Sequence, residues 1–395
     1  MKPATPPGRE RTAPALTVTT EGLAWLGVAL LMGGLGWWKS INLLLLLAYL
    51  MITLVALNAV LCRAHARRVR AAVEPSPPIY AGEDATVRLT ATNTGTAPAT
   101  ASVEYRAADE PTAWLVNRLA PGVAAVCEGQ WRSITRGRQR AAAVVSSGFP
   151  LGLCRYEHRD EALTDVVVLP PPGEADPDGL RRWVAAQVGG DGRARKVLRR
   201  VTTDQADVRG VRPYRPGDSI RTIHWRSSAR RAELMVREYD AAPSPELVLV
   251  VEPWLPDDPS AADRAAFEGA LSLAVTVART WVRVYAARVV VAVAGAGEPP
   301  RSAAGSEVSL REALAPLADA TGAPDHPAIE AREFDRSLAR AARVVVSSRA
   351  NTPYVDAMSA ATGRRFVPLS PADVPPWYRA PGSGAKGRLA VRRRD

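Results

Sequence analysis

Two long apolar runs near the N-terminus constrain the fold of this chain more than any other feature. The first covers residues 23–38, and the second covers residues 41–62 and is broken by only three polar residues. A helix needs about 20 apolar residues to cross a bilayer. A cleaved signal peptide is disfavoured because the second run follows at once, and a buried core hairpin is disfavoured by the charged flanks. We therefore expect residues 22–62 to form a transmembrane helical hairpin.

The basic residues that flank the two runs predict their orientation. Three lie within residues 1–21, four arginines lie within residues 63–70, and the turn between the runs carries only Lys39. Because Lys and Arg collect on the cytoplasmic side, both termini are expected there, with Trp37 and Trp38 at the outer interface. The predicted location is therefore the cell membrane, multi-pass, with the soluble domains in the cytoplasm and the arginines near lipid headgroups.

Composition limits the chemistry that this chain can carry. The 395 residues have a formal net charge of +11, which favours an anionic partner, either lipid headgroups or nucleic acid. Three cysteines show no C-x-x-C spacing, and no two of the four histidines are close enough to form a helical metal pair. We expect no disulfide framework, no metal site and no cofactor. Unpaired cysteines also fit a reducing cytoplasm.

Residues 73–170 have the pattern of an antiparallel β-sandwich. Short segments there alternate apolar and polar residues and are separated by Pro and Gly, with no long helical period between them. The predicted strands cover residues 85–92, 101–106, 124–131, 140–146 and 166–169.

Residues 241–370 have a different pattern, in which apolar strands alternate with amphipathic helices. This order predicts a parallel sheet of Rossmann-like α/β character. The predicted strands are residues 247–251, 288–294, 343–347 and 364–368, and the predicted helices are residues 261–284, 310–320 and 353–362. A basic linker with a short helix at 180–187 occupies residues 180–240, and the Gly- and Arg-rich tail, residues 380–395, is expected to be disordered.

The basic linker contains the densest cluster of Arg, Trp and His in the chain, at residues 214–230. A Pro-Gly-Asp turn places Asp218 where it could cap a helix that begins at Ser219. On such a helix Arg221 and Trp225 lie four residues apart and could form a cation–π pair. The like-charged Arg226 and Arg230 are also four apart, so an acid or an anion is expected between them.

Several interpretations of this cluster remain open. It could be a structural clip in which the arginines pair with Glu233, Glu238 or Asp240. It could be a protein-docking surface, since interfaces favour Trp and Arg, or an anion site, since Arg matches phosphate geometry. No Gly-rich phosphate cradle or aromatic ladder is present, so nucleic acid is not the expected partner. Catalysis by His224 lacks a Ser or Cys nucleophile signature, and no catalytic residue is predicted. The candidate residues for binding or for the clip are Tyr214, Asp218, Arg221, His224, Trp225, Arg226 and Arg230.

The same cluster resembles the motif of the domain-of-unknown-function 58 family. The matching residues are Tyr214, Pro216-Gly-Asp218, Arg221, Ile223-His-Trp225, Ala229-Arg230 and Val236-Arg-Glu238, with weaker support from Arg136-Gly137 and residues 148–152. The resemblance implies two membrane helices, a β-sandwich, the motif and a von Willebrand A-like α/β domain. It also implies a MoxR-type AAA+ ATPase as partner, often with a membrane transglutaminase-like protein, and no established enzymatic activity.

Von Willebrand A domains often hold a divalent cation through Asp-x-Ser-x-Ser after the first strand. Here residues 251–254 read Val-Glu-Pro-Trp, so Glu252 supplies one carboxylate without the Ser pair. Magnesium needs several oxygen ligands in an octahedral array, so the family resemblance does not imply a metal site here. Whether Glu252 contributes to a cation site stays open. The predicted function is a non-enzymatic membrane-anchored scaffold or adaptor for a MoxR-type ATPase. The alternative is a module that binds an anionic ligand or lipid headgroup through Arg221, Arg226 and Arg230.

Overall fold

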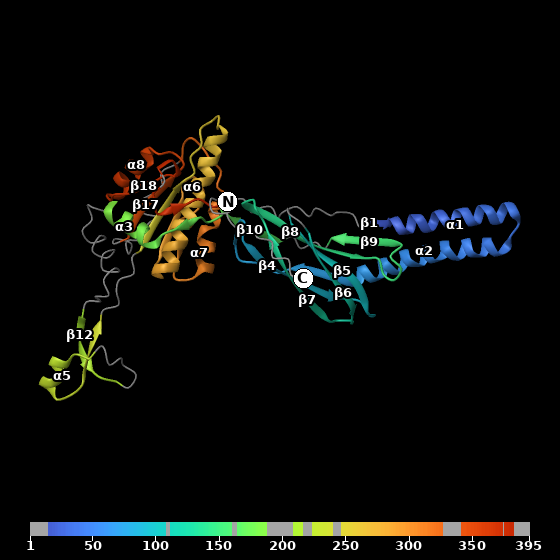
Figure 1. The fold of residues 1–395 in the computed structure, drawn as a ribbon, viewed down its shortest axis with the longest axis horizontal. Coiled ribbons are helices and arrows are strands. Elements are labelled where there is room, and N and C mark those ends of the chain that lie inside the picture. Colours follow the sequence, from blue (N-terminus) through green and yellow to red (C-terminus); the bar gives the residue numbers. More distant parts are fainter. Residues whose placement is uncertain are drawn as a thin grey trace, which may run out of the picture. The chain divides into compact units, whose positions relative to one another are not determined.

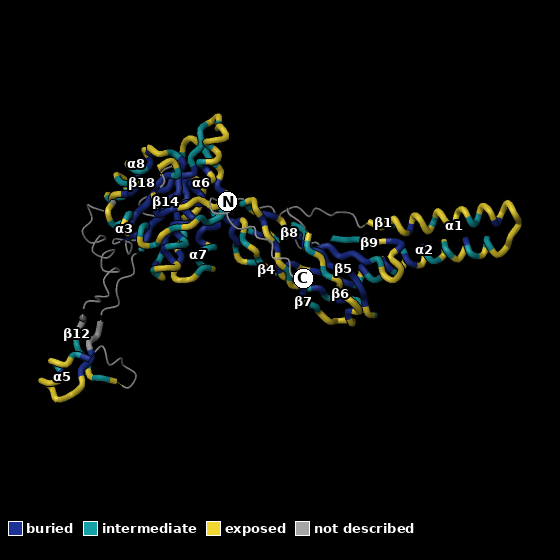
Figure 2. The backbone as a smooth tube through the Cα atoms, viewed as in Figure 1, coloured by how far each residue is buried: buried dark blue, intermediate teal, exposed yellow. Residues whose placement is uncertain are grey.

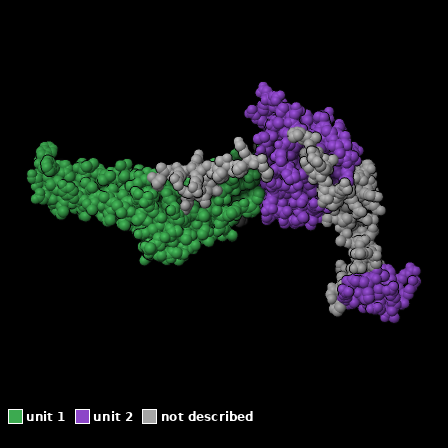
Figure 3. Space-filling model, turned by 180° about the vertical axis from the view of Figure 1, so that it is seen from behind, with its two compact units in different colours: residues 1–168 green, residues 169–395 purple. Residues whose placement is uncertain are grey.

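The protein was analysed as a computed structural model. The structure describes residues 15–107, 111–159, 164–187, 208–215, 223–239, 246–326, 341–373 and 375–382. The chain divides into two compact units, residues 1–168 and 169–395 (Figure 3). Each unit has its own sheets and its own buried residues (Figure 2).

The first unit begins with a helical hairpin. Helices α1 (Thr20–Lys39) and α2 (Asn42–Arg68) lie antiparallel and side by side (Figure 1), and Ser40 makes the turn in the left-handed conformation with φ 56°. The predicted pair of helices is therefore present. The prediction that both span a membrane is not confirmed, because α2 alone among the described residues is long and apolar enough. Five glycines and the terminal Glu21 and Lys39 lower the hydropathy of α1.

The ends of the hairpin also differ from the prediction. Helix α2 does not end at Cys62 but continues through the arginines to Arg68 and passes directly into strand β2 (Val69–Val73). Upstream, residues 15–18 do not extend the first apolar helix. They form strand β1 (Ala15–Val18), which pairs antiparallel with β9 (Cys154–Arg159).

The predicted β-sandwich is present and consists of two sheets. A three-stranded sheet has the order β2-β4-β7, and a seven-stranded sheet has the path β1-β9-β8-β10-β3, with β5 paired to β8 and β6 paired to β5. Apolar residues of both sheets, among them Leu89 and Val103, form one core. The remaining strands are β3 (Ile79–Tyr80), β4 (Asp84–Asn93), β5 (Ala99–Arg106), β6 (Thr112–Leu119), β7 (Ala124–Arg132), β8 (Gly137–Ser147) and β10 (Thr164–Leu169).

The second unit contains a five-stranded α/β sheet with the order β16-β15-β14-β17-β18. The pairs β14–β15, β14–β17 and β17–β18 are parallel, whereas the edge strand β16 is antiparallel, so the sheet is mixed rather than wholly parallel. The strands are β14 (Leu247–Glu252), β15 (Val289–Val293), β16 (Arg301–Ala303), β17 (Ala342–Ser347) and β18 (Val367–Leu369).

Helices α6, α7 and α8 accompany this sheet (Figure 1). Helix α6 (Ala261–Tyr285) buries residues along most of its length, α7 (Glu307–Leu314) passes into a 3-10 turn at Ala315–Leu317, and α8 is Pro353–Thr362. The predicted helix 310–320 therefore begins earlier and ends at the turn that contains Pro316. Strand β11 (Glu174–Ala175), which precedes helix α3 (Pro177–Gln187), pairs with β19 (Tyr378–Arg379) and so joins the two ends of this unit. The predicted tail lies outside the described residues from 383 onward.

Candidate functional site

The described residues of the Arg-Trp-His cluster lie in a small lobe of the second unit, built from a two-stranded sheet and one short helix. Strands β12 (Val208–Pro213) and β13 (Met235–Tyr239) pair antiparallel, and helix α5 (Trp225–Arg231) lies between them in sequence. Ile223 forms an isolated bridge with Val236 just before the helix. Ile223, Met235 and Val236 are buried, so this lobe has a small apolar interior of its own.

Helix α5 begins at Trp225, not at Ser219, and its cap is His224. The backbone N–H of Ser227 donates to His224 Nδ1 at 3.1 Å, and the His224 N–H donates to the Met235 carbonyl at 2.8 Å. The predicted helix therefore does not run unbroken through Ile223 and His224 into α5, and its start at Ser219 lies outside the described residues. His224 acts as a hydrogen-bond acceptor that satisfies a free helix N–H group. Asp218, the predicted cap, lies outside the described residues.

The side chains of Trp225, Arg226 and Arg230 are exposed on α5, and 64% of the Trp225 surface is open. Among the residues that the structure describes, no hydrogen bond or ion pair joins Arg226 or Arg230 to a partner. Positions four residues apart share a face of a helix, so the two guanidinium groups lie on the same side of α5. Exposed Trp and Arg side chains on one short helix are a common composition of protein-docking surfaces.

Other residues of the cluster bear less directly on this surface. Tyr214 is half-buried after β12, and its N–H donates to the Leu234 carbonyl at 2.8 Å. The predicted Arg221–Trp225 cation–π pair and the side chains of Glu238 and Asp240 lie outside the described residues. Glu233, the other acid proposed for a structural clip, is exposed. The clip interpretation therefore stays a prediction.

Sequence reasoning did not identify Ser228, which holds the lobe together. Its hydroxyl oxygen accepts the N–H of Met235 at 2.9 Å, and the hydroxyl donates to the His224 carbonyl at 3.1 Å. This side chain is buried and connects α5 to the start of β13. A Ser in a polar, Arg-rich segment gives no pattern that would distinguish this role from an exposed one.

A second candidate lies at the carboxyl ends of β14 and β17, the edge at which open α/β sheets usually bind ligands. Glu252, the last residue of β14, is buried, and its Oε1 accepts Arg349 Nη2 at 2.6 Å. Its Oε2 accepts the hydroxyl of Thr352 at 2.6 Å. The Arg349 guanidinium also lies 5.1 Å from the centre of the Trp254 ring. Both carboxylate oxygens are thus occupied by protein donors. Within the described ranges, no group of three or more His, Cys, Asp or Glu is placed so that it could hold a metal ion.

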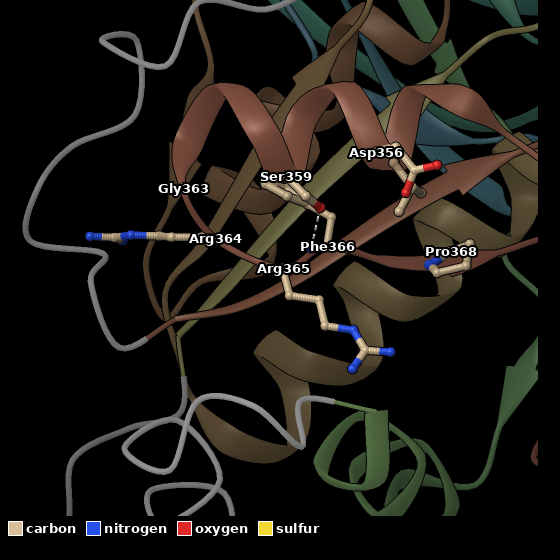
Figure 4. A pocket seen from close by; sticks show the side chains of 8 residues that line it. Asp356, Ser359, Gly363, Arg364, Arg365, Phe366 and Pro368 are labelled. Carbon is tan, nitrogen blue, oxygen red and sulfur yellow. Dashed lines mark hydrogen bonds between the residues drawn. The ribbon is translucent and has the colours of Figure 1, made fainter.

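A third candidate is an open pocket of about 430 Å³ beside the C-terminal end of α8. Figure 4 shows Arg364 and Arg365 leaving the same turn in different directions, with Asp356 on the helix nearby. Phe366 N–H donates to the Ser359 hydroxyl at 3.0 Å, and both residues line the pocket. The pocket mixes charges of both signs and adjoins the start of β18, the opposite edge from Glu252. The geometry of this pocket does not indicate a particular ligand or reaction.

Comparison with known proteins gives a match to one family model and distant structural likenesses, among them two structures of one CARDB domain. A family model described as "Protein of unknown function DUF58" matches residues 210–368. No curated protein matches the chain. The solution NMR structure of a CARDB domain from Pyrococcus furiosus is similar with 17% identity and a TM-score of 0.20, and covers 26% of this chain and 94% of that one. The crystal structure of that domain in complex with di-metal ions has 16% identity and a TM-score of 0.20, with 26% and 87% covered.

Proposed function

Since this chain belongs, through residues 210–368, to the DUF58 family of unknown function, we propose its function from the geometry of the lobe. The chain is a non-enzymatic membrane-anchored scaffold or adaptor, and Trp225, Arg226 and Arg230 form its docking surface for an acidic region of a protein partner. The observation that carries the proposal is the exposed Trp225 beside two arginines that have no partner among the described residues. The motif resemblance suggests a MoxR-type AAA+ ATPase as that partner and a von Willebrand A-like character for the α/β domain.

The proposal includes a membrane anchor in which both α1 and α2 cross the bilayer and both chain ends face the cytoplasm. Most large apolar side chains of both helices are exposed, an arrangement that is unfavourable in water and favourable in lipid. The 20 residues of α1 rise about 30 Å, the thickness of a hydrocarbon core. Where the helices face each other, buried Ala29, Gly36 and Ala48 let their backbones approach closely, as in many membrane helix pairs.

Binding of a purified MoxR-type ATPase from the same organism to the full chain in lipid nanodiscs tests the docking surface. We expect Trp225→Ala, and separately Arg226→Ala with Arg230→Ala, to weaken binding by more than about tenfold, since truncation of a central interface residue typically costs about 2 kcal/mol. The arginine variant should also lose most of the salt dependence of the association rate.

Arg182→Ala is the matched control for the arginine variants. Arg182 lies on helix α3 of the same unit with a side chain 74% exposed and an ion pair to Asp176 at 3.8 Å, so its loss removes one arginine charge elsewhere on the surface. This variant should bind as the unmodified chain does. Unchanged binding by the Trp225 and Arg226/Arg230 variants, or equal weakening by Arg182→Ala, would argue against a docking surface on α5.

The second candidate function is the binding of an anionic ligand or lipid headgroup by the same arginines. The unpartnered pair Arg226 and Arg230 supports it, because two guanidinium groups one turn apart match a phosphate. The isolated lobe-containing unit would then bind anionic vesicles at low salt, lose that binding in the Arg226/Arg230 variant, and keep it in Trp225→Ala. Absence of vesicle binding by the unmodified unit would argue against this function and favour the protein partner.

A further inference from the structure

The loop of residues 148–153, here called the basal loop, joins β8 to β9 at the base of the helical hairpin. It presents two large apolar side chains to solvent, Phe149 with 43% and Leu151 with 51% of their surface exposed. The sequence Gly-Phe-Pro-Leu-Gly is short and apolar, and the docking surface on α5 does not use it. Neighbouring exposed apolar side chains mark an interaction or membrane site more often than scattered single ones do.

Both helices hold the basal loop in place. From α2, Asn58 is fully buried, its amide nitrogen donating to the Gly148 carbonyl at 3.3 Å and its oxygen accepting the Cys154 N–H at 2.8 Å. From the start of α1, the Thr19 hydroxyl lies 2.8 Å from the Gly152 carbonyl. The loop is thus a fixed part of the hairpin base, with several of its backbone polar groups already satisfied by protein. Backbone polar groups that are already hydrogen-bonded cost less free energy to move out of water.

The contacts of the loop also fix its level along α2. Gly148 bonds Asn58, and the ring of Phe149 lies 4.7 Å from that of His65, so the loop lies beside residues 58–65. Along this stretch the apolar run of α2 ends, and the exposed Arg63 and Arg67 begin. Arginines at the end of a membrane helix lie at the headgroup level, so the loop is at the boundary between hydrocarbon and headgroups.

The surroundings of the loop match that boundary chemically. Val18, which pairs with Cys154 in the strand register, is exposed beside the start of α1, and Trp25 is exposed one turn into that helix. Arg63 and Arg67 lie 5.8 and 5.9 Å from the ring of Tyr156, so basic groups flank the apolar ones. Apolar tips with adjacent basic and aromatic groups are the composition of segments that lie in a membrane interface.

From this placement we infer that the basal loop is a lipid-contact site, in which Phe149 and Leu151 insert into the interfacial layer of the bilayer. The inference rests on the proposed membrane anchor and extends it. The hairpin carries the chain across the membrane, while the loop fixes the β-sandwich against the membrane surface. The ligand is the boundary of phospholipid acyl chains and headgroups, not a protein.

Photo-crosslinking of the full chain in vesicles of phosphatidylcholine and phosphatidylglycerol tests the site. p-Benzoylphenylalanine is placed at position 149 or 151, and the vesicles carry an alkyne on the acyl chains so that lipid adducts can be isolated. Val60, 65% exposed on α2, reports the anchor itself. Ile134, 75% exposed between β7 and β8, is the matched apolar control. Ile134 lies two residues after Arg132, which pairs with Asp84, the first residue of β4. The other end of β4 lies next to α2, because the N–H of Thr94, just after β4, donates to the Arg68 carbonyl. Ile134 is therefore at the end of the sandwich away from the hairpin.

We expect lipid adducts at positions 149 and 151 in yields close to that at Val60 and at least about tenfold above that at Ile134, as insertion into the interface requires. Adducts at Val60 without adducts at 149 and 151 would overturn the inference and leave the anchor intact. No adduct at Val60 would remove the anchor and the inference with it. Equal yields at Ile134 and the loop, or protein adducts instead of lipid adducts at 149 and 151 in native membranes, would also overturn it.

Discussion

Three buried polar side chains each join two elements of this protein. Asn58 connects α2 to the basal loop, Ser228 connects α5 to β13, and Glu252 connects β14 to the segment that precedes α8. A buried polar group costs free energy unless its hydrogen bonds are made, so each of these contacts is sensitive to the loss of its partner. The consequence is sharpest at Glu252, where the buried group is a carboxylate.

Removal of the guanidinium that pairs with Glu252 should be strongly destabilising. We expect Arg349→Met to lower the free energy of unfolding by about 3 kcal/mol, because it leaves a buried charge without its partner. Glu252→Gln should cost less, since an amide still accepts the Thr352 hydroxyl and the partly exposed Arg349 can reach water. Urea unfolding followed by Trp fluorescence measures both. Combining the two changes should restore part of the Arg349→Met loss, and a double variant no more stable than Arg349→Met contradicts this account.

His224 should matter as a helix cap rather than as a base. We expect His224→Ala to lower the stability of the lobe by about 1 kcal/mol, as loss of an N-cap acceptor typically does. His224→Asp, which supplies another acceptor, should keep most of that stability. Hydrogen exchange of the peptide that contains the Ser227 amide measures the difference. Equal exchange in the Ala and Asp variants would show that the Ser227 contact with His224 Nδ1 has no stabilising effect.

The capping box of α6 predicts a dependence on pH. Hydrogen bonds from the Ser260 hydroxyl and N–H lower the pKa of Asp263 below its ordinary value. A group with a lowered folded pKa stabilises the fold above its unfolded pKa, about 3.9, and this contribution is lost as the pH falls through the folded pKa. Ser260→Ala should raise the Asp263 pKa part of the way back, as an NMR titration of the carboxyl carbon can show. Ser306→Ala, the same change at the cap of α7, should leave the Asp263 pKa unchanged.

At the scale of elements, the hairpin depends on a close approach between α1 and the basal loop. A Cβ at Gly22 would collide with the Leu153 carbonyl oxygen, a backbone atom that cannot rotate away, whereas a Cβ at Gly27 would meet nothing within 4 Å. The same residue type on the same helix therefore has two different roles. Gly22 permits contact with the sandwich, and Gly27 only lowers the helix propensity.

Gly22→Ala should therefore destabilise the chain in detergent by about 1–3 kcal/mol, the usual cost of overpacking a tight contact. Gly27→Ala should be neutral or stabilising by up to about 1 kcal/mol, because Ala is the better helix former. Thermal unfolding monitored by circular dichroism compares the two variants. A Gly22→Ala chain as stable as Gly27→Ala would mean that α1 can shift away from the loop without cost.

At the scale of the whole molecule, the two units should differ in how they tolerate loss of the hairpin. Leu153, Cys154 and Tyr156 form one buried cluster with α2, and β1 covers the edge of β9. A chain that begins at residue 69 exposes this apolar cluster and an unpaired strand edge, and we expect it to self-associate. A chain that begins at residue 170 keeps the α/β sheet and should remain monomeric. Size-exclusion chromatography with light scattering decides, and a monomeric chain from residue 69 would contradict the expectation.

Much of the fold was predictable because its signals are local. Strands β4, β5, β7, β8 and β10 alternate apolar and polar residues or are flanked by Pro and Gly, and β14 is a continuous apolar run. Strands β6 and β9 were missed because arginine, asparagine or other polar residues interrupt their patterns. In the candidate site, the shared face of Arg226 and Arg230 follows from helical spacing. The exposure of Trp225 does not, because the same residues also fitted a structural clip. The start of α5 at Trp225 could not be predicted either, because a Pro-Gly-Asp turn signals a helix cap more strongly than a His does.

By itself the sequence determined the two apolar helices, the order of sandwich and α/β sheet, and the location of the Arg-Trp cluster, since each depends on neighbouring residues. The tertiary structure decided the pairings between distant segments. It placed β1 against β9, attached α2 to the basal loop through Asn58, and neutralised Glu252 with Arg349, a residue 97 positions away. Local periodicity reports which face of an element is buried. It carries no information about which distant residue will supply a hydrogen bond or a charge, and that choice depends on how the complete chain packs.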